Sequence, residues 1–197
     1  MKEYIISRCV GDPDWNRVPA LQMQEFLFPS KSDVTAKAQV CYDAEAIYVR
    51  LEATESQIRA SHTGPLDEIC EDSCLEFFIS PMADGRYFNI EVNPNGAIYL
   101  GFGTGLHNLQ RLIGEQPAIT PKTHRTDTGW VAEYAIPVSF LQLFFPDFTP
   151  APGNFIRANC FKCGDLTPIP HWLCWNKIPE EVATFHCPQH FGTMYFG

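Results

Sequence analysis

Short runs of residues that alternate between apolar and polar constrain the fold of this 197-residue chain more than any other feature. In the run 87–93 the apolar residues Phe88, Ile90 and Val92 recur at every second position, which is the period of a half-buried strand and not of a helix. The chain also has 13 glycines and 16 prolines along its whole length, and these residues end strands and helices early. The pattern predicts an all-β protein.

The strand-like runs follow one another at short intervals. Residues 43–45 (Asp-Ala-Glu) separate two of them and predict a hairpin, and residues 94–96 (Pro-Asn-Gly) predict a second tight turn. Pro137 predicts the start of one short helix over 138–145. The predicted strands are 36–42, 46–53, 73–80, 86–93, 97–102, 117–124, 129–136, 154–161 and 192–196. This series predicts an antiparallel β-sandwich, of the jelly-roll or immunoglobulin-like kind, as a single domain over residues 1–197.

The charge of the chain limits its partners. The net charge is −9, and the sequence has no cluster of the cations that displace counterions from nucleic-acid phosphates, so we expect a neutral ligand and no nucleic acid. Residues 1–8 lack the apolar run of a signal peptide, and no run approaches the roughly 20 apolar residues of a membrane span. A cytoplasmic protein without a membrane partner is expected. Its eight cysteines are expected to be mostly reduced and buried.

Six polar side chains are embedded in otherwise apolar strand runs. They are Glu76, Asn89, Glu91, Asn93, Arg157 and Asn159. One interpretation is structural: buried polar groups need partners, so Arg157 could pair with Glu76 or Glu91, or the six could form an ordinary solvated sheet face. The other is functional. Amides, carboxylates and a guanidinium suit sugar hydroxyls, because each hydroxyl both donates and accepts hydrogen bonds.

Two tryptophans follow a proline-rich loop near the end of the chain. Trp172 and Trp175 flank Leu173-Cys174, and in an extended segment their odd spacing turns them to opposite faces. A tryptophan in a β protein is more often part of the core than a platform for a ligand. We therefore expect one of the two to be core and the other to be free to bind ligand. Trp175 is favoured for this role, and Trp172 is kept as a further candidate ligand-binding residue.

Several segments resemble one known family. They are 71–79, 87–96, 129–137, 157–165 and 171–175 with 185–192. In this order they resemble the core of the family 9 carbohydrate-binding modules, and within that family the group that includes stand-alone proteins. The resemblance covers roughly residues 70–197.

The resemblance implies a β-sandwich without a catalytic centre that binds a mono- or oligosaccharide, often at the reducing end of a chain. The sugar lies between aromatic rings, with polar groups beneath it. Glu76 matches the ligand-binding carboxylate of the family, and Trp175 matches its late tryptophan. A second aromatic residue is expected shortly before Glu76, but Ile69 and Cys70 stand there.

No cofactor is expected except a structural calcium ion, which some members of the family hold. The acidic residues that could bind it are Asp67, Glu68, Glu71 and Asp72, although they form no ligand loop of defined spacing.

Two alternatives have a chemical basis. Cys160 and Cys163 have zinc-knuckle spacing and, with His171 and Cys174, could close a structural zinc site. Against zinc, the odd spacing of the first two directs them to opposite faces of a strand. The second alternative is a glycoside hydrolase that uses Glu76 and Glu91 as its paired carboxylates, but a structural pair is favoured because both lie on regular strands. The sequence therefore predicts carbohydrate binding without catalytic residues.

Overall fold

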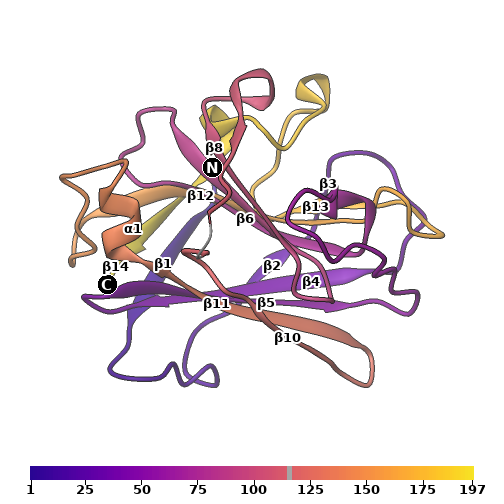
Figure 1. Ribbon diagram of the computed structural model, residues 1–197, viewed down its shortest axis with the longest axis horizontal. Helices are drawn as coiled ribbons and strands as arrows, with labels where there is room; N and C mark the ends of the chain where they lie inside the picture. The colour runs from indigo at the N-terminus through magenta and orange to yellow at the C-terminus, as the bar shows by residue number, and fades with distance from the viewer. Residues whose placement is uncertain (115–116) are drawn as a thin grey trace.

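The computed structural model, which describes residues 1–114 and 117–197, has two β-sheets packed face to face (Figure 1). Sheet A contains β14 (Gly192–Phe196), β12 (Phe155–Cys163), β6 (Cys74–Ser80), β7 (Tyr87–Val92), β8 (Ile98–Gly103), β9 (Gln110–Arg111), β13 (Trp172–Cys174) and β3 (Glu25–Phe26). Sheet B contains β4 (Thr35–Tyr42), β5 (Ala46–Thr54), β11 (Gly129–Pro137), β10 (Lys122–Arg125) and β2 (Leu21–Met23). In Figure 1 sheet B lies along the bottom and sheet A crosses above it.

The strand β1 (Glu3–Arg8) joins the two sheets, and it makes the architecture mixed. Its first residues pair in parallel with β14 in sheet A, and its last two pair in parallel with β4 in sheet B. The prediction of a β-sandwich is confirmed, but the prediction that all of its strands are antiparallel is wrong at β1. A hairpin forces neighbouring strands to run antiparallel, and β1 lies beside strands to which no hairpin connects it.

Most of the predicted strands and turns are present. The hairpin of β4 and β5 turns at residues 43–45, and β7 and β8 are joined at residues 94–96 as predicted. The run 117–124 is wrong in its first half, because β10 begins only at Lys122. The helix α1 (Val138–Gln142) is shorter than predicted, and four 3₁₀ turns accompany it: η1 (Ile69–Glu71), η2 (Leu106–Asn108), η3 (Glu180–Val182) and η4 (Pro188–His190). None of the helices in the described part of the chain is long and apolar enough to cross a membrane.

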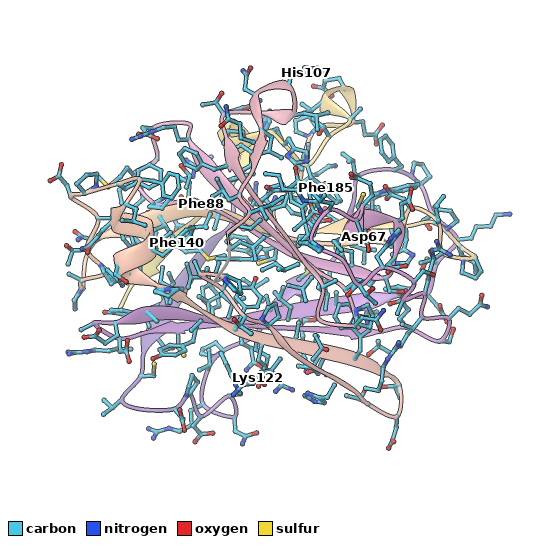
Figure 2. The ribbon with its side chains drawn as sticks, in the orientation of Figure 1. Asp67, Phe88, His107, Lys122, Phe140 and Phe185 are labelled. Carbon is cyan, nitrogen blue, oxygen red and sulfur yellow. The ribbon has the colours of Figure 1, made fainter. Side chains whose placement is uncertain are left out.

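The core between the sheets follows the alternation of the strands. Phe88, Ile90 and Val92 of β7 are fully buried there, as the sequence pattern predicts. The Phe88 ring packs against Phe140 of α1, with 5.2 Å between the ring centroids (Figure 2). The inward side chains of β7 thus fix the direction of the intervening residues, which point to the other face of sheet A.

A second apolar cluster covers that other face of sheet A. The C-terminal segment 178–191 folds back over the strands, and Phe185 stacks on Phe161 of β12 with 4.1 Å between the ring centroids. The outer cluster consists of Leu27, Ile69, Cys74, Phe78, Tyr87, Phe161, Cys163, Cys174, Ile178, Phe185, Cys187 and Phe191. Both faces of sheet A are therefore largely buried, and the prediction of an ordinary solvated sheet face is wrong for its central strands.

One buried ion pair ties the two sheets together. Lys162 of β12 has no exposed surface, and its Nζ lies 3.3 Å from Oε2 of Glu55, the residue that follows β5. The same Nζ lies 2.8 Å from His171 Nε2 and donates to the Cys163 carbonyl oxygen at 2.8 Å. Glu55 in turn accepts a hydrogen bond from the Ser73 hydroxyl at 2.6 Å. Every charge in this group has a partner, as burial requires.

We predict that Lys162→Met lowers the free energy of unfolding by about 3–5 kcal/mol, because it leaves Glu55 as an unpaired buried charge. The double variant Lys162→Met/Glu55→Gln should lose less than the sum of the two single variants, since neither charge is then left alone. Urea denaturation of the four proteins measures the cycle. Lys37→Met breaks the half-exposed pair with Glu52 (3.1 Å) and serves as the control, with a cost below about 1 kcal/mol. If the stability losses of the two single variants simply add in the double variant, Lys162 and Glu55 do not form a stabilising ion pair.

Candidate functional site

A pocket of about 340 Å³ interrupts the outer apolar cluster of sheet A. Its floor is formed by β6, β7 and the end of β12, and its walls come from η1, the connection between β8 and β9, and the segment 183–186. The β8–β9 connection and the loop that carries η3 form the top of the molecule in Figure 1, and Figure 2 labels His107 and Phe185 in this region. Segments far apart in the sequence therefore enclose one cavity on the sheet.

Two carboxyl groups lie at the floor of the pocket. Glu76 of β6 and Glu91 of β7 are direct partners across the two strands, and they are only 2% and 7% exposed. Burial raises the pKa of Glu76 to about 8, and it raises the pKa of Glu91 well above its usual range, with the neighbouring Glu76 as the second cause. At neutral pH this pair therefore retains protons that exposed carboxyls would lose.

The Glu76 carboxyl also belongs to a hydrogen-bonded group with two thiols. The Cys163 thiol donates to Glu76 Oε1 at 2.9 Å, and Cys74 lies opposite Cys163 in the pairing of β6 with β12. One ligand atom from each of the three residues lies within 4.8 Å of the others, which is a spacing that a soft metal ion could bridge. However, Cys163 donates a proton that a metal ligand would have lost, and burial raises the pKa of Cys74 to about 12. The arrangement is that of protonated, hydrogen-bonded groups.

An indole forms one wall of the pocket. Trp172 is half-buried, and its Nε1–H donates to Asp165 Oδ1 at 2.7 Å, which fixes the plane of the ring. The Phe28 ring meets it edge-on, with 5.4 Å between the ring centroids. The register of β13 on β12 places Trp172 directly opposite Cys163, so both side chains lie on the outer face of sheet A. The wall is therefore rigid and apolar.

Further aromatic side chains surround the cavity. Tyr99 of β8 lines it, and the Arg111 guanidinium lies over the Tyr99 ring at 4.1 Å from the centroid. His186 lines it as well, with Nδ1 at 2.8 Å from the Tyr87 hydroxyl, and burial lowers the pKa of His186 to about 4. The imidazole is therefore neutral at pH 7, and it adds no positive charge to the pocket.

The prediction that Trp175 faces outward is wrong. Trp175 is 4% exposed and belongs to the core between the sheets, where a Cβ added to Gly192 would lie 2.4 Å from its ring. The two tryptophans do point to opposite faces, as their spacing predicts, but Trp172 is the one that lines the pocket. Alternation alone does not say which face is which. The pairing of β13 with β12 decides it.

The other four predicted polar residues do not line the pocket. Asn89 donates to Glu91 Oε1 at 2.7 Å and so supports a pocket residue from below. A Cβ at Gly101 would lie 2.1 Å from Asn89 Oδ1, so only glycine fits beside it. Asn159 exchanges hydrogen bonds with the backbone of Asn176. The amides of Asn89 and Asn159 therefore stabilise the fold and do not line the pocket.

Asn93 and Arg157 also have structural partners. Asn93 donates to Asp72 Oδ2 at 2.8 Å and to the His62 carbonyl oxygen at 2.9 Å. Arg157 donates from Nε to the carbonyl oxygens of Phe191 and Gly192, each at 3.1 Å. The predicted pairing of Arg157 with Glu76 or Glu91 is therefore wrong, because the C-terminal segment occupies the guanidinium. Of the eight predicted site residues, Glu76, Glu91 and Trp172 line the pocket.

The acidic residues considered for calcium are held by nitrogen donors. Asp72 is fully buried, and its carboxylate accepts the backbone N–H groups of Ser61 and His62 in addition to the Asn93 amide. A calcium ion needs six to eight oxygen ligands with free lone pairs, so the Asp72 carboxylate does not fit one. Calcium binding stays a prediction for Asp67, Glu68 and Glu71.

The residues proposed for zinc are not brought together. Cys160 belongs to the core between the sheets, whereas Cys163 and Cys174 belong to the outer cluster. His171 faces the Lys162 ammonium group at 2.8 Å. The odd spacing of Cys160 and Cys163 separates them across sheet A, as strand alternation requires, so the zinc alternative is wrong for this set of residues.

Several residues of the pocket were not singled out from the sequence. Among them are Tyr99, Asp165, Phe185 and His186, whereas Glu68 was considered only for calcium and Cys163 only for zinc. Cys70 stands where a second aromatic ring was expected, so Tyr99 supplies a ring from another strand instead. Asp165 lies two residues after the end of β12 at Cys163, and only this closeness in the sequence could have indicated a polar group at that end of the strand.

A β-sandwich that carries a pocket with aromatic walls and a polar floor is typical of small-molecule and sugar-binding domains. The model of the family described as "Carbohydrate-binding family 9" matches residues 14–196. The chain belongs to this family, as the resemblance of its sequence segments predicted. None of the curated proteins matches the chain in sequence.

Solved structures share the fold over nearly the whole chain. A putative carbohydrate-binding protein from Bacteroides uniformis ATCC 8492 has a TM-score of 0.85 and 24% identity, and the match covers 100% of this chain and 99% of that one. A family 9 module from Caldicellulosiruptor kristjanssonii in complex with glucose has a TM-score of 0.71 and 15% identity over 100% and 96% of the two chains. The complex with cellotriose has a TM-score of 0.72 and 15% identity over 99% and 93%.

The raised pKa of Glu76 predicts a pH-dependent stability. The folded protein holds this proton up to about pH 8, whereas an unfolded chain releases it near the ordinary pKa of 4.5. The stabilising contribution of the protonated group is therefore complete below pH 4.5 and is lost as the pH rises to about 8, at about 1.4 kcal/mol per pH unit.

We expect Glu76→Gln to remove this loss, so that the variant gains stability relative to the unaltered protein between pH 5 and pH 8. Urea denaturation across this range measures the difference. Glu45→Gln, at an exposed position in the β4–β5 turn, is the control and should leave the pH profile unchanged. Parallel profiles for Glu76→Gln and the unaltered protein would contradict the burial argument.

Proposed function

We propose that the pocket on sheet A binds the end of a saccharide, with the sugar ring against Trp172 and its polar groups toward Glu76 and Glu91. The observation that carries the proposal is that an indole fixed by Asp165 and two buried carboxyls face the same cavity. A pyranose has an apolar C–H face and a rim of hydroxyl groups. It therefore needs a flat apolar surface beside groups that donate and accept hydrogen bonds, and the pocket offers both.

The size of the pocket favours one sugar unit over an extended chain. Its volume of about 340 Å³ lies at the lower end of the roughly 300–1,000 Å³ that small-molecule sites occupy. Sheet A closes the pocket from below, so an internal unit of a polysaccharide would have to bend around the walls. A chain end, including a reducing end, enters without this constraint. Related family 9 modules have been solved with glucose, a single unit, and with cellotriose, a short chain that has a free end, and both ligands are compatible with the binding of a chain end.

The same carboxyls argue for binding without hydrolysis. A glycosidase needs one protonated and one ionised carboxyl group. The surroundings of the two groups in its active site therefore set their pKa values apart. Here burial raises the pKa of both Glu76 and Glu91, so the environment shifts the two pKa values in the same direction and does not set an acid apart from a base. We therefore infer that the pair forms hydrogen bonds with the sugar and performs no chemistry on it.

Trp172→Ala should weaken the binding of glucose or cellotriose by about 1–3 kcal/mol, the usual contribution of a stacked ring, and should leave the fold intact because the indole is half-buried. Isothermal titration calorimetry measures the affinity. Trp15→Ala, which removes a half-buried tryptophan outside the pocket, is the matched control and should bind as the unaltered protein does. Unchanged affinity in Trp172→Ala would remove this residue from the site.

We also expect no turnover of aryl glycosides, even at high protein concentration, because burial raises the pKa of both floor carboxyls instead of setting an acid apart from a base. A panel of chromogenic glycosides covering α and β linkages tests this expectation. Reproducible release of the chromophore that is lost in Glu76→Gln would replace the binding function with a hydrolase.

A further inference from the structure

Apart from the neutral imidazole of His186, every titratable side chain that lines the pocket is an acid. Glu68, Glu76, Glu91 and Asp165 contribute four carboxyl groups. Within residues 1–114 and 117–197, neither lysine nor arginine lines the cavity. A neutral sugar brings no charge to this lining, whereas a cation can pair with a carboxyl group that gives up its proton. The lining therefore favours a ligand that brings a positive charge.

The nearest cations are occupied elsewhere. The Arg111 guanidinium lies over the Tyr99 ring, donates to the Asp67 carbonyl oxygen, and is 3.9 Å from the rim carboxylate of Glu68. Lys162 points into the space between the sheets, where Glu55 and His171 hold its ammonium group. Neither side chain reaches the floor pair by a direct hydrogen bond. In the part of the chain that the structure describes, the two buried carboxyls therefore lie side by side without a cation bonded directly to either of them.

The floor pair also has unused acceptor atoms. Oε1 of Glu76 accepts from Cys163 at 2.9 Å, and Oε1 of Glu91 accepts from Asn89 at 2.7 Å. For the second oxygen of each carboxyl, the described part of the chain supplies no hydrogen-bond donor, and both residues are more than nine-tenths buried and line the cavity. An ammonium group has three donors and no acceptor, so one such group could serve both free oxygens.

We propose that the pocket is selective for an amino sugar, a saccharide end that carries a protonated primary amine held between Glu76 and Glu91. This inference rests on the proposed function, and it changes the expected ligand from neutral to cationic. The net charge of the chain, −9, opposes phosphates and nucleic acids but does not oppose a cation. The sugar ring keeps its place against Trp172, and the amine pairs with the carboxylate that forms when the floor pair releases a proton.

Binding of the amine replaces one carboxyl proton of the floor pair with the ammonium group of the ligand. In the free protein the floor pair holds protons, and the entering ammonium forms an ion pair with a carboxylate. One carboxyl O–H bond therefore breaks and its proton leaves to the buffer, while the amine keeps all three of its protons. A neutral sugar makes hydrogen bonds with the protonated pair and displaces no proton. The two kinds of ligand thus differ in a quantity that calorimetry measures directly.

The test is a titration of the full chain, after treatment with a chelator, with glucose, N-acetylglucosamine and the 2-, 3-, 4- and 6-amino-deoxy derivatives of glucose. At about pH 6.5 these amines are largely protonated. We expect at least one amino sugar to bind roughly ten- to a hundredfold more tightly than glucose, because its ammonium group forms charge-assisted hydrogen bonds, which are stronger than those of a neutral hydroxyl group. Titrations in buffers of different ionisation enthalpy should show release of about one proton for that sugar and about none for glucose.

Glu91→Gln should abolish the proton release and should lower the affinity for that amino sugar by a larger factor than it lowers the affinity for glucose, and Glu45→Gln is the control that retains the preference and the proton release. If Glu91→Gln fails to fold, the proton count in the unaltered protein still decides. Glucose binding with no preference for any amino sugar would overturn this inference and leave the proposed function standing. If none of the sugars binds, both this inference and the proposed function are wrong. Stoichiometric binding of Zn²⁺ to the chelator-treated protein without an amine preference would assign the acidic lining to a metal instead.

Discussion

The burial of the outer face of sheet A is the constraint on which the rest of the structure depends. In most two-sheet sandwiches with alternating strands, that face is open to water. Here the segment 178–191 folds back over it, and Phe185 and Phe191 cover the central strands. The polar residues at alternate positions are thereby desolvated, and each needs a partner within the protein. Asn93, Arg157 and Asn159 find theirs in neighbouring loops.

The pocket is the place where this cover is incomplete. Glu76 and Glu91 are buried deeply enough for their pKa values to rise, yet both face the cavity. The protein completes the surroundings of these carboxyls on one side only, with the Cys163 thiol and the Asn89 amide. A ligand that supplies donors completes the other side. Recognition and desolvation are thus two consequences of one packing arrangement, because the same apolar cover excludes water and shapes the walls.

The pair of tryptophans shows how far a local pattern reaches. Their odd spacing correctly predicts opposite faces, since alternation is a property of any extended strand. The choice of face depends on the register of β13 against β12, which brings together residues separated by a long loop. That register places Trp172 beside the pocket and Trp175 in the core, against Gly192 of a distant strand. The alternation of side chains is compatible with either assignment, so the local pattern alone does not make this choice.

The sequence by itself determined the all-β class, the turns at residues 43–45 and 94–96, and the inward face of β7, because strand period and turn chemistry are local. It also determined that Glu76 and Glu91 lie on the face opposite the core. Only the tertiary structure decided the parallel pairing of β1, the direction of Trp172, and the recruitment of Tyr99, Asp165 and His186 to the pocket. These features rest on contacts between distant segments, whose geometry is set by packing and register rather than by the neighbours of each residue in the chain.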